Sequence, residues 1–185
     1  MSGDLGVRVK SELRTIQDED QLVAELELLG IHYLSRLTSY QASEVRAPDT
    51  LLADMVQQPS ARVRQAVIAV LLMHPHYAEA VPDALQQLPP PAQLTLRRLY
   101  TAVIMLQRKC ADQLRPLQAR RWQWLPDLFS AEIDLPSSNS VDQKLAALGQ
   151  RHRHLTGAVV NWRGSYENVV HHLAQSRELS TQRDQ

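Results

Sequence analysis

Apolar side chains recur at steps of three and four residues along most of this 185-residue chain, and this spacing constrains its fold more than any other feature. A helix turns once every 3.6 residues, so residues spaced in this way form a stripe along one of its faces. Alternation typical of a strand is confined to Val7 and Val9, which are too few to form one. The chain also has only six glycines and one phenylalanine, a composition that favours helix over sheet. We therefore expect an all-α fold, either an irregular helical bundle or a short α-α superhelix with HEAT-like hairpins.

The longest predicted helix covers about 92–114, after a stiff connector of three prolines at 89–91. Pro116 is expected to stop it, because proline cannot continue the helical hydrogen bonds. Its apolar stripe consists of Ala92, Leu96, Leu99, Val103, Leu106 and Cys110.

A second long helix is predicted from Asp18 to about Tyr40. Gly30 lies within it and is expected to weaken it by about 1 kcal/mol without breaking it. Carboxylates such as Glu25 and Glu27 are expected on exposed faces of the helix or near its ends. Shorter helices are predicted over 51–56, 60–74, 77–88, from a capping box at Ser140 and Gln143, and after Gly157, with an irregular aromatic segment over 117–136.

The chain is expected to form a single α-helical domain over residues 1–175, followed by a disordered polar tail over 176–185. Its one cysteine, Cys110, has no second thiol in the chain for a disulfide, which favours a reducing compartment. The start of the chain lacks the apolar stretch of a signal peptide. The most apolar run, residues 66–73, is much shorter than the ~20 residues that span a bilayer. The sequence thus predicts a cytoplasmic protein that does not enter a membrane.

Charge is balanced over the whole chain but divided between its halves. Residues 1–92 carry seven Lys or Arg against twelve Asp or Glu, whereas residues 93–185 carry thirteen against eight. The halves differ in sign, so they can attract each other or present a basic face to a partner.

Residues 51–88, LLADMVQQPSARVRQAVIAVLLMHPHYAEAVPDALQQL, contain an apolar helix, a turn with a proline, and Arg-Val-Arg at the start of a second apolar helix. This pattern resembles a HEAT-type helical repeat, and the resemblance implies two antiparallel helices. It also implies that Arg64 ties to an acidic turn residue, although Ser60 and Ala61 occupy that position here. No second copy follows at a period of about 40 residues. A single repeat-like hairpin in an irregular fold and a true HEAT array therefore remain alternatives.

The first functional hypothesis follows from this resemblance. Helical repeat proteins bind partners on the surface formed by the second helices of successive hairpins. Here that surface includes Arg62, Arg64 and Gln65. We expect a non-enzymatic protein-interaction or scaffold module that binds a protein partner through these residues.

The second hypothesis concerns the basic half of the chain. Arg97, Arg108 and Arg115 are expected to align at intervals of three and two helical turns, with Arg98 and Lys109 in a parallel row. Together with the tryptophans at 122 and 124, such a surface can hold phosphates and stack bases. The alternative is a solvated helix face that neutralises the acidic half, with the tryptophans in the core. The predicted nucleic-acid-binding residues are Arg97, Arg98, Arg108, Lys109, Arg115, Arg120 and Arg121.

Residues 148–173, LGQRHRHLTGAVVNWRGSYENVVHHL, resemble small bacterial proteins that accompany nucleotidyltransferases. This resemblance implies a regulatory partner of a nucleotidyltransferase or of a toxin-like enzyme. It adds to the second hypothesis, in which the basic half makes the contact.

Patterns for catalysis, metal binding and cofactor binding are missing from the sequence. Four histidines fall in the last third of the chain, but His152 and His154, like His171 and His172, lack the helical spacing that places two ligands on one face. Cys110 lies on an apolar stripe, where a thiol is usually inert. The six glycines are scattered, so no phosphate-binding loop or nucleophile elbow can be built. We expect no catalytic residue, no metal site and no cofactor.

Overall fold

The computed structural model describes residues 18–32, 34, 40–118, 121–133, 135–137, 140–156 and 162–183; for 155–156, 162–163 and 177–183 it describes only the backbone. All regular elements in these residues are helical, as predicted. They are a segment over 18–28, α2 (Pro48–Gln57), α3 (Ala61–Met73), the 3₁₀ helix η1 (Pro75–Ala80), α4 (Val81–Gln86), α5 (Pro90–Lys109), α6 (Ala111–Gln118), α7 (Val141–Thr156) and α8 (Trp162–Arg183).

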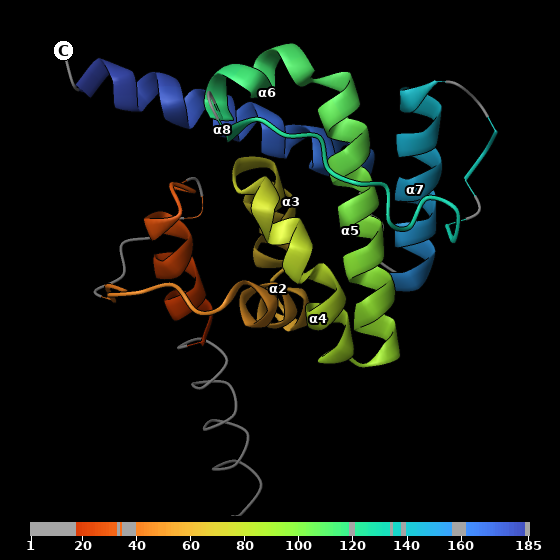
Figure 1. Ribbon diagram of the computed structural model, residues 1–185, viewed down its shortest axis with the longest axis horizontal. Coiled ribbons are helices and arrows are strands. Elements are labelled where there is room, and N and C mark those ends of the chain that lie inside the picture. The colour runs from red at the N-terminus through yellow and green to blue at the C-terminus, as the bar shows by residue number, and fades with distance from the viewer. Residues whose placement is uncertain are drawn as a thin grey trace, which may run out of the picture.

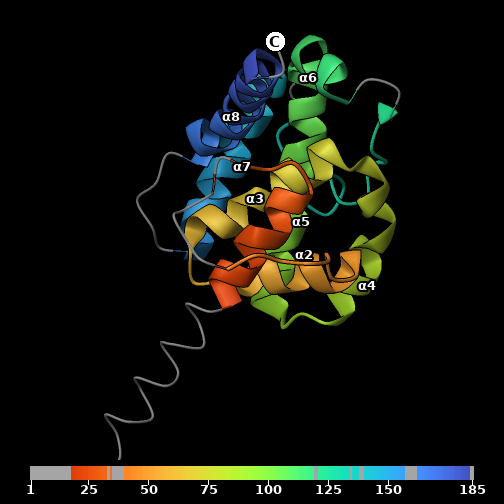
Figure 2. The ribbon, with the colours of Figure 1, turned by 90° about the vertical axis from the view of Figure 1, so that its left-hand side faces the viewer.

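Helix α3 lies at the centre of the molecule. Its residues 66–72 are all fully buried, which amounts to almost two complete turns. Every side of this part of the helix therefore needs a covering element. Helices α2, α5 and α8 pack against it, while α7 packs against α5 and α8 on the outside (Figures 1 and 2). The most apolar run of the sequence is thus a helix buried on all sides and not an amphipathic one.

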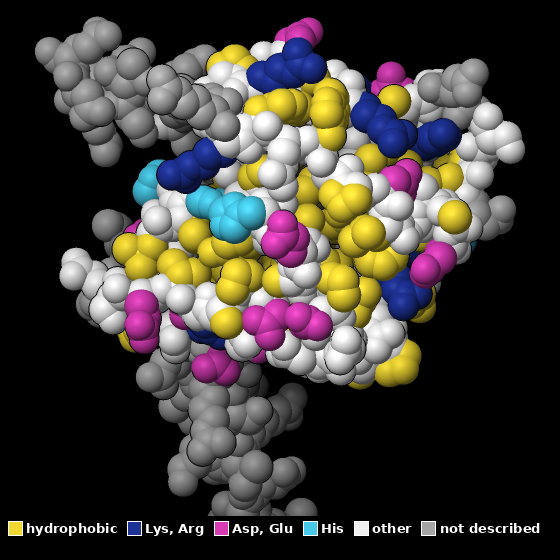
Figure 3. Space-filling view, in the orientation of Figure 1, with side chains coloured by type: hydrophobic (Ala, Val, Ile, Leu, Met, Phe, Trp, Pro, Cys, Tyr) yellow, Lys and Arg dark blue, Asp and Glu magenta, His cyan; other side chains and the backbone are white. Residues whose placement is uncertain are grey.

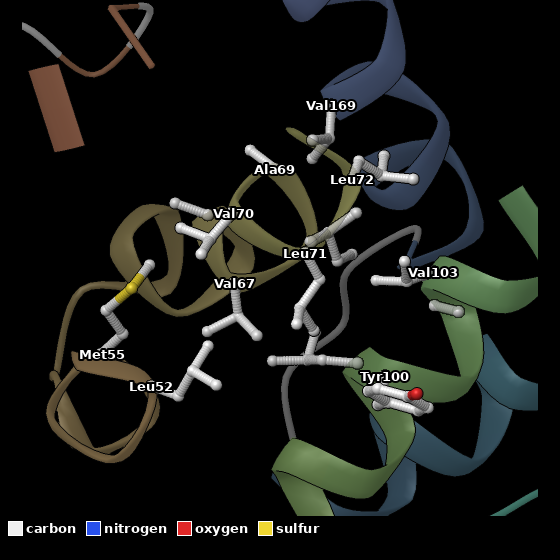
Figure 4. Close-up of a cluster of buried hydrophobic side chains, with 14 of the residues drawn as sticks. Leu52, Met55, Val67, Ala69, Val70, Leu71, Leu72, Tyr100, Val103 and Val169 are labelled. Atoms are coloured by element: carbon white, nitrogen blue, oxygen red, sulfur yellow. The ribbon is translucent and has the colours of Figure 1, made fainter. Parts of the chain in front are cut away.

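Figure 4 shows how side chains from four helices meet around α3. Leu52 and Met55 of α2 approach Val67 on one side of α3, and Tyr100 of α5 and Val169 of α8 lie on other sides. The buried apolar residues form one continuous core that extends from Leu22 to Leu173. Residues that are far apart in the sequence therefore share a single hydrophobic core.

The first long helix ends earlier than predicted. Gly30 has a φ of +78°, in the left-handed region that suits glycine. The Gly30 N–H donates to the carbonyl oxygen of Glu27 at 2.9 Å, and the Ile31 N–H donates to the carbonyl oxygen of Leu26 at 2.9 Å. These two bonds form a Schellman cap. Both Leu26 and Ile31 are fully buried, so the cap also has its usual hydrophobic contact. The expectation that Gly30 leaves the helix intact is wrong, and residues 33 and 35–39 of the predicted helix lie outside the described residues.

The predicted helix over 92–114 is two helices. It begins at Pro90, so the prolines at 90 and 91 form the first turn of α5 and do not act as a stiff connector. The helix ends at Cys110, whose φ of −114° and ψ of 24° are not helical. Helix α6 then starts at Ala111 and includes Pro116, which was expected to stop the chain's longest helix. Proline has no N–H to bond to the carbonyl group four residues earlier, which here belongs to Asp112. Both Pro116 and Asp112 are exposed, so water can bind this carbonyl group and the helix tolerates the proline.

The other predicted elements agree with the structure more closely. The backbone amide of Gln143 donates to Ser140 Oγ at 3.4 Å, so Ser140 caps the start of α7, as the pattern predicts. Helix α8, predicted to follow Gly157, buries Tyr166, Val169 and Leu173, whose spacing of three and four residues places them on one face. It continues through residue 176 to Arg183, so the expected boundary between domain and tail does not coincide with the end of a helix.

Candidate functional site

Of the three residues predicted to bind a protein partner, Arg62 and Gln65 line a pocket, while Arg64 binds the backbone of its own turn. Its Nη1 donates to the carbonyl oxygens of Gln58 at 2.5 Å and Pro59 at 2.7 Å. These carbonyls take the place of the acidic turn residue that the HEAT resemblance implies. Burial lowers the pKa of the Arg64 guanidinium. Arg64 therefore holds the turn between α2 and α3, whereas Arg62 and Gln65 lie on another face of α3.

Arg62 and Gln65 line a pocket between the start of α3 and the middle of α8, with a volume of about 210 Å³. The two residues are three apart, so they share one face of α3. Three polar residues of α8 form the other wall, at spacings of three and four that again share one face. We call this the α3–α8 pocket, and it is lined by Leu34, Arg62, Gln65, Ser165, Asn168, Val169 and His172.

The lining of the α3–α8 pocket combines an apolar base with a polar rim. Leu34 and Val169 are each only 3% exposed, so they belong to the core and present their side chains as its base. The other lining residues that the structure describes carry amide, hydroxyl, imidazole or guanidinium groups, and none of these described residues carries a carboxylate. Such a pocket can hold a group that has an apolar stem and a polar or anionic end.

The volume of the α3–α8 pocket limits what can enter it. Pockets for cofactors and drug-sized ligands usually measure about 300–1,000 Å³. At about 210 Å³ this pocket is smaller, and its size is closer to that of one or two amino-acid side chains.

A separate polar cluster is buried where α5, α7 and α8 meet. His152 is 1% exposed, and its Nδ1 lies 2.7 Å from the hydroxyl oxygen of the fully buried Tyr166. Burial, and to a lesser extent the nearby charges of Arg98 and Arg64, lower the pKa of His152 to about 4. Burial also raises the pKa of Tyr166. Both side chains are therefore neutral at pH 7, and their hydrogen bond joins α7 to α8 inside the core.

The basic residues of α5 are engaged in interactions within the second half of the chain. Arg97 forms an ion pair with Glu132 at 2.7 Å, and Lys109 forms ion pairs with Asp142 at 2.5 Å and Glu167 at 2.8 Å. Arg108 lies 3.7 Å from Asp127, and Arg98 donates to the carbonyl of Arg151 at 3.0 Å. In Figure 3, most Lys and Arg side chains of this face lie on its upper half, and acidic side chains lie among them as well as below. The acids that pair with α5 thus come from the second half, where the net charge is positive.

Arg115 does not align with Arg97 and Arg108, because the helix breaks at Cys110. It lies beside two tryptophans, the exposed Trp124 and the half-buried Trp122, which packs against the core. The Arg115 guanidinium lies 5.6 Å from the ring centroid of Trp122 and 5.8 Å from that of Trp124. Trp124 is 52% exposed, so the expectation of a core position is wrong for this residue. The exposed Arg121 is the residue before Trp122, and Arg120 lies outside the described residues.

Sequence reasoning missed the α8 wall of the pocket. Ser165, Asn168 and His172 lie at helical spacing on a helix that was predicted, so a polar face of α8 was visible in the sequence. Nothing in the sequence indicated that this face lies beside residues 62 and 65, about a hundred positions earlier. His171 and His172 have ring centroids 6.2 Å apart. Among the described residues, no three His, Cys, Asp or Glu side chains are grouped closely enough to hold a metal ion.

Across the described residues, every helix is too short or too polar to span a bilayer. No protein-family model, curated protein or solved structure matches the chain, so comparison assigns it neither a family nor a repeat.

Proposed function

We propose that this protein is a cytoplasmic protein-interaction module that binds a segment of a partner protein in the α3–α8 pocket. In this proposal the α2–α3 hairpin acts as a HEAT-like unit, and Arg62 and Gln65 contact the partner. The protein acts without catalysis and without a cofactor. The observation that carries the proposal is that two residues expected to bind a partner line one pocket together with polar residues of α8.

The dimensions and lining of the pocket support a protein ligand over a free cofactor. Its volume of about 210 Å³ suits side chains of a docked segment. Its walls are helices packed on the common core, so the pocket is formed before a partner arrives. A preformed pocket lowers the entropy cost of binding.

Affinity capture from the native cell, with quantification of co-purifying proteins, tests this proposal. Arg62→Glu should remove the specific partner, because it reverses the charge on one wall of the pocket while leaving the core untouched. Arg153→Glu is the matched control, since it makes the same change of charge at an exposed residue of α7 that the described pocket lining does not include. Equal capture by the wild-type protein and Arg62→Glu would exclude the pocket as the docking surface.

A second candidate function is favoured by the cluster of Arg115, Trp122 and Trp124. An arginine beside an exposed tryptophan can stack a base and neutralise a phosphate of a single strand. This arrangement suits a nucleic-acid-binding protein or a regulatory partner of a nucleotidyltransferase or toxin-like enzyme. A titration of the protein with an oligothymidylate, monitored by tryptophan fluorescence, tests this second function. Binding should weaken between ~50 and ~200 mM salt and be lost in Trp124→Ala. An affinity that does not change with salt concentration would count against nucleic-acid binding.

A further inference from the structure

Helix α5 binds the backbone of the irregular segment over residues 121–133, which we call the strap and which crosses α5 in Figure 1. The Gln107 side-chain amide donates to the carbonyl of Gln123 at 3.1 Å and accepts from the N–H of Leu125 at 3.0 Å. These two backbone groups lie on either side of Trp124. A single residue of a neighbouring parallel strand binds the same pair of groups. One carboxamide of α5 therefore holds the strap as an adjoining strand would.

Tyr100 binds the strap two turns earlier on α5. Its hydroxyl donates to the carbonyl of Pro126 at 2.9 Å. Tyr100 and Gln107 are seven residues apart, so they share one side of α5, which we call the strap face. Tyr100 is fully buried and Gln107 is 1% exposed. Buried polar groups need hydrogen-bond partners, so the strap face suits a cover that offers backbone carbonyl and N–H groups. Any protein segment has such groups, whatever its sequence.

Two apolar side chains of the strap add anchors to these backbone contacts. Leu125 and Phe129 lie four positions apart, and each is 7% exposed. The Phe129 ring packs edge-on against Tyr100, with ring centroids 5.3 Å apart. The Arg97 guanidinium lies 5.7 Å from the centroid of the Phe129 ring. In contrast, Leu128 of the strap is 38% exposed, so the strap face selects two apolar positions and leaves their neighbours free to vary.

The other contacts of the strap with α5 are ion pairs open to solvent. Arg97 lies 2.7 Å from Glu132, and Arg108 lies 3.7 Å from Asp127. Ion pairs as exposed as these add little to stability. The strap thus depends on two apolar anchors and three side-chain hydrogen bonds, whereas residues 66–72 of α3 are buried on all sides. A segment held in this way opens at a lower cost than the centre of the core.

From these observations we propose that the strap face of α5 is a docking site for an extended segment of a partner protein, and that the strap is an autoinhibitory occupant which this segment displaces. The partner segment carries two apolar side chains four positions apart, as Leu125 and Phe129 are. Its backbone takes the hydrogen bonds of Gln107 and Tyr100, and its side chains take the two anchor positions. The residues of the strap face are not among the described residues that line the α3–α8 pocket, so the inference goes beyond the proposed function and does not depend on it.

Hydrogen exchange of the full-length ¹⁵N-labelled wild type tests whether the strap opens by itself. The Leu125 amide reports on the strap, because it is bound to the buried Gln107 side chain. We expect it to be protected at least about tenfold less than the amides of α3. Its exchange should also change little at low urea concentrations, because a local opening exposes little surface.

Fluorescence anisotropy of a fluorescein-labelled peptide with the strap sequence, RWQWLPDLFSAEI, measures docking on the full-length chain. Phe129→Ser in the protein removes one anchor of the chain's own strap and leaves the strap face unchanged. This variant should bind the peptide at least about tenfold more tightly than the wild type, because its strap competes less. Leu128→Ser is the matched control, since it changes the exposed neighbour, and it should bind the peptide as the wild type does.

Two further changes connect binding to the strap face. Adding Gln107→Leu to the Phe129→Ser protein should remove binding, because the amide that holds the backbone is lost. A peptide that itself carries Phe129→Ser should not bind. Protected α3 amides show that each variant is folded.

Each outcome decides for or against the inference. Tighter binding by Phe129→Ser that is lost with Gln107→Leu supports it, as does local exchange of the Leu125 amide in the wild type. Equal binding by Phe129→Ser and Leu128→Ser, or equal binding of the two peptides, overturns it. If the Leu125 amide has the same protection and urea dependence as the α3 amides, the strap opens only when the whole chain unfolds. That result overturns the inference without use of any variant.

Discussion

Arg46 forms a two-pronged ion pair with Glu25, with 2.8 Å from Nε to Oε2 and 2.6 Å from Nη2 to Oε1. Glu25 is 2% exposed, so the expectation of an exposed face or helix end is wrong for this residue. The backbone amide of Arg46 also donates to Glu25, and its Nη1 contacts Asp54 of α2. These bonds fasten the segment over 18–28 to α2. Burial alone raises the pKa of Glu25, but Arg46 outweighs it and the pKa is lowered.

Replacing Arg46 by alanine should destabilise the fold by about 3–5 kcal/mol, because Glu25 is then left as an unpaired buried charge. Urea unfolding at pH 7 measures the loss. The double variant Arg46→Met/Glu25→Met should lose less free energy of unfolding than Arg46→Ala, since it removes both charges together. Because the pKa of Glu25 is lowered in the fold from the ordinary carboxyl value of 4.5, the pair stabilises the protein fully above pH 4.5 and loses this effect as the pH falls from there through the lowered pKa. A loss below about 1 kcal/mol in Arg46→Ala would show that the ion pair matters little.

His152 should make the stability depend on pH in the weakly acidic range. Its pKa falls from 6.5 to about 4 on folding, so the unfolded chain binds a proton more readily than the folded one below pH 6.5. Stability is therefore lost as the pH drops from 6.5 toward 4, by about 2 kcal/mol between pH 7 and pH 5. Burial also lowers the pKa of His74, which adds to the loss in the same direction.

Urea midpoints of the wild type and of His152→Leu at pH 7 and pH 5 measure this contribution. The variant should be less stable at pH 7, because Tyr166 loses its hydrogen-bond partner, but its stability should change less between the two pH values. His154 is exposed, so His154→Gln is the matched control and should keep the wild-type pH dependence. An equal pH dependence in His152→Leu would contradict the assignment.

Gly30→Ala should cost about 1–2 kcal/mol, because an alanine at a φ of +78° is strained. A Cβ atom built on Gly30 meets nothing within 4 Å, so the cost comes from the backbone alone. Gly30→Asn should cost less, since asparagine adopts this conformation more readily. The midpoint of thermal unfolding should therefore be highest for the wild type, lower for Gly30→Asn and lowest for Gly30→Ala. A neutral Gly30→Ala would show that the Schellman cap is not retained in solution.

Gln107 should prove necessary for the irregular segment that carries the tryptophans. Its side chain is 1% exposed, donates to the carbonyl of Gln123 at 3.1 Å, and accepts from the amide of Leu125 at 3.0 Å. Gln107→Leu leaves both backbone groups without their partner, at about 1–3 kcal/mol for each group that stays buried. Hydrogen exchange should show faster exchange of the Leu125 amide, while the amides of α3 stay protected. Unchanged exchange at Leu125 would contradict this role.

Local features of the fold followed from short-range sequence patterns. The cap at Ser140 and Gln143 needs only a contact between residues three apart. It could therefore be predicted from these two residue types alone. The buried face of α8 follows equally from the spacing of Tyr166, Val169 and Leu173. Periodicity alone did not predict the break between α5 and α6. The apolar stripe of α5 continues through Cys110, although the backbone leaves the helical region at this residue.

Short-range sequence patterns establish that this chain is helical, where most of its helices lie and which side chains they bury, because hydrophobic periodicity and end caps act within one element. Three features depend on long-range packing: α3 is covered on all sides, Arg64 binds its own turn, and Glu25 is buried beside Arg46. The pocket is the clearest case, because its walls come from residues about a hundred positions apart. Which helix faces meet depends on how the whole set of apolar surfaces packs together, and no short stretch of sequence contains that information.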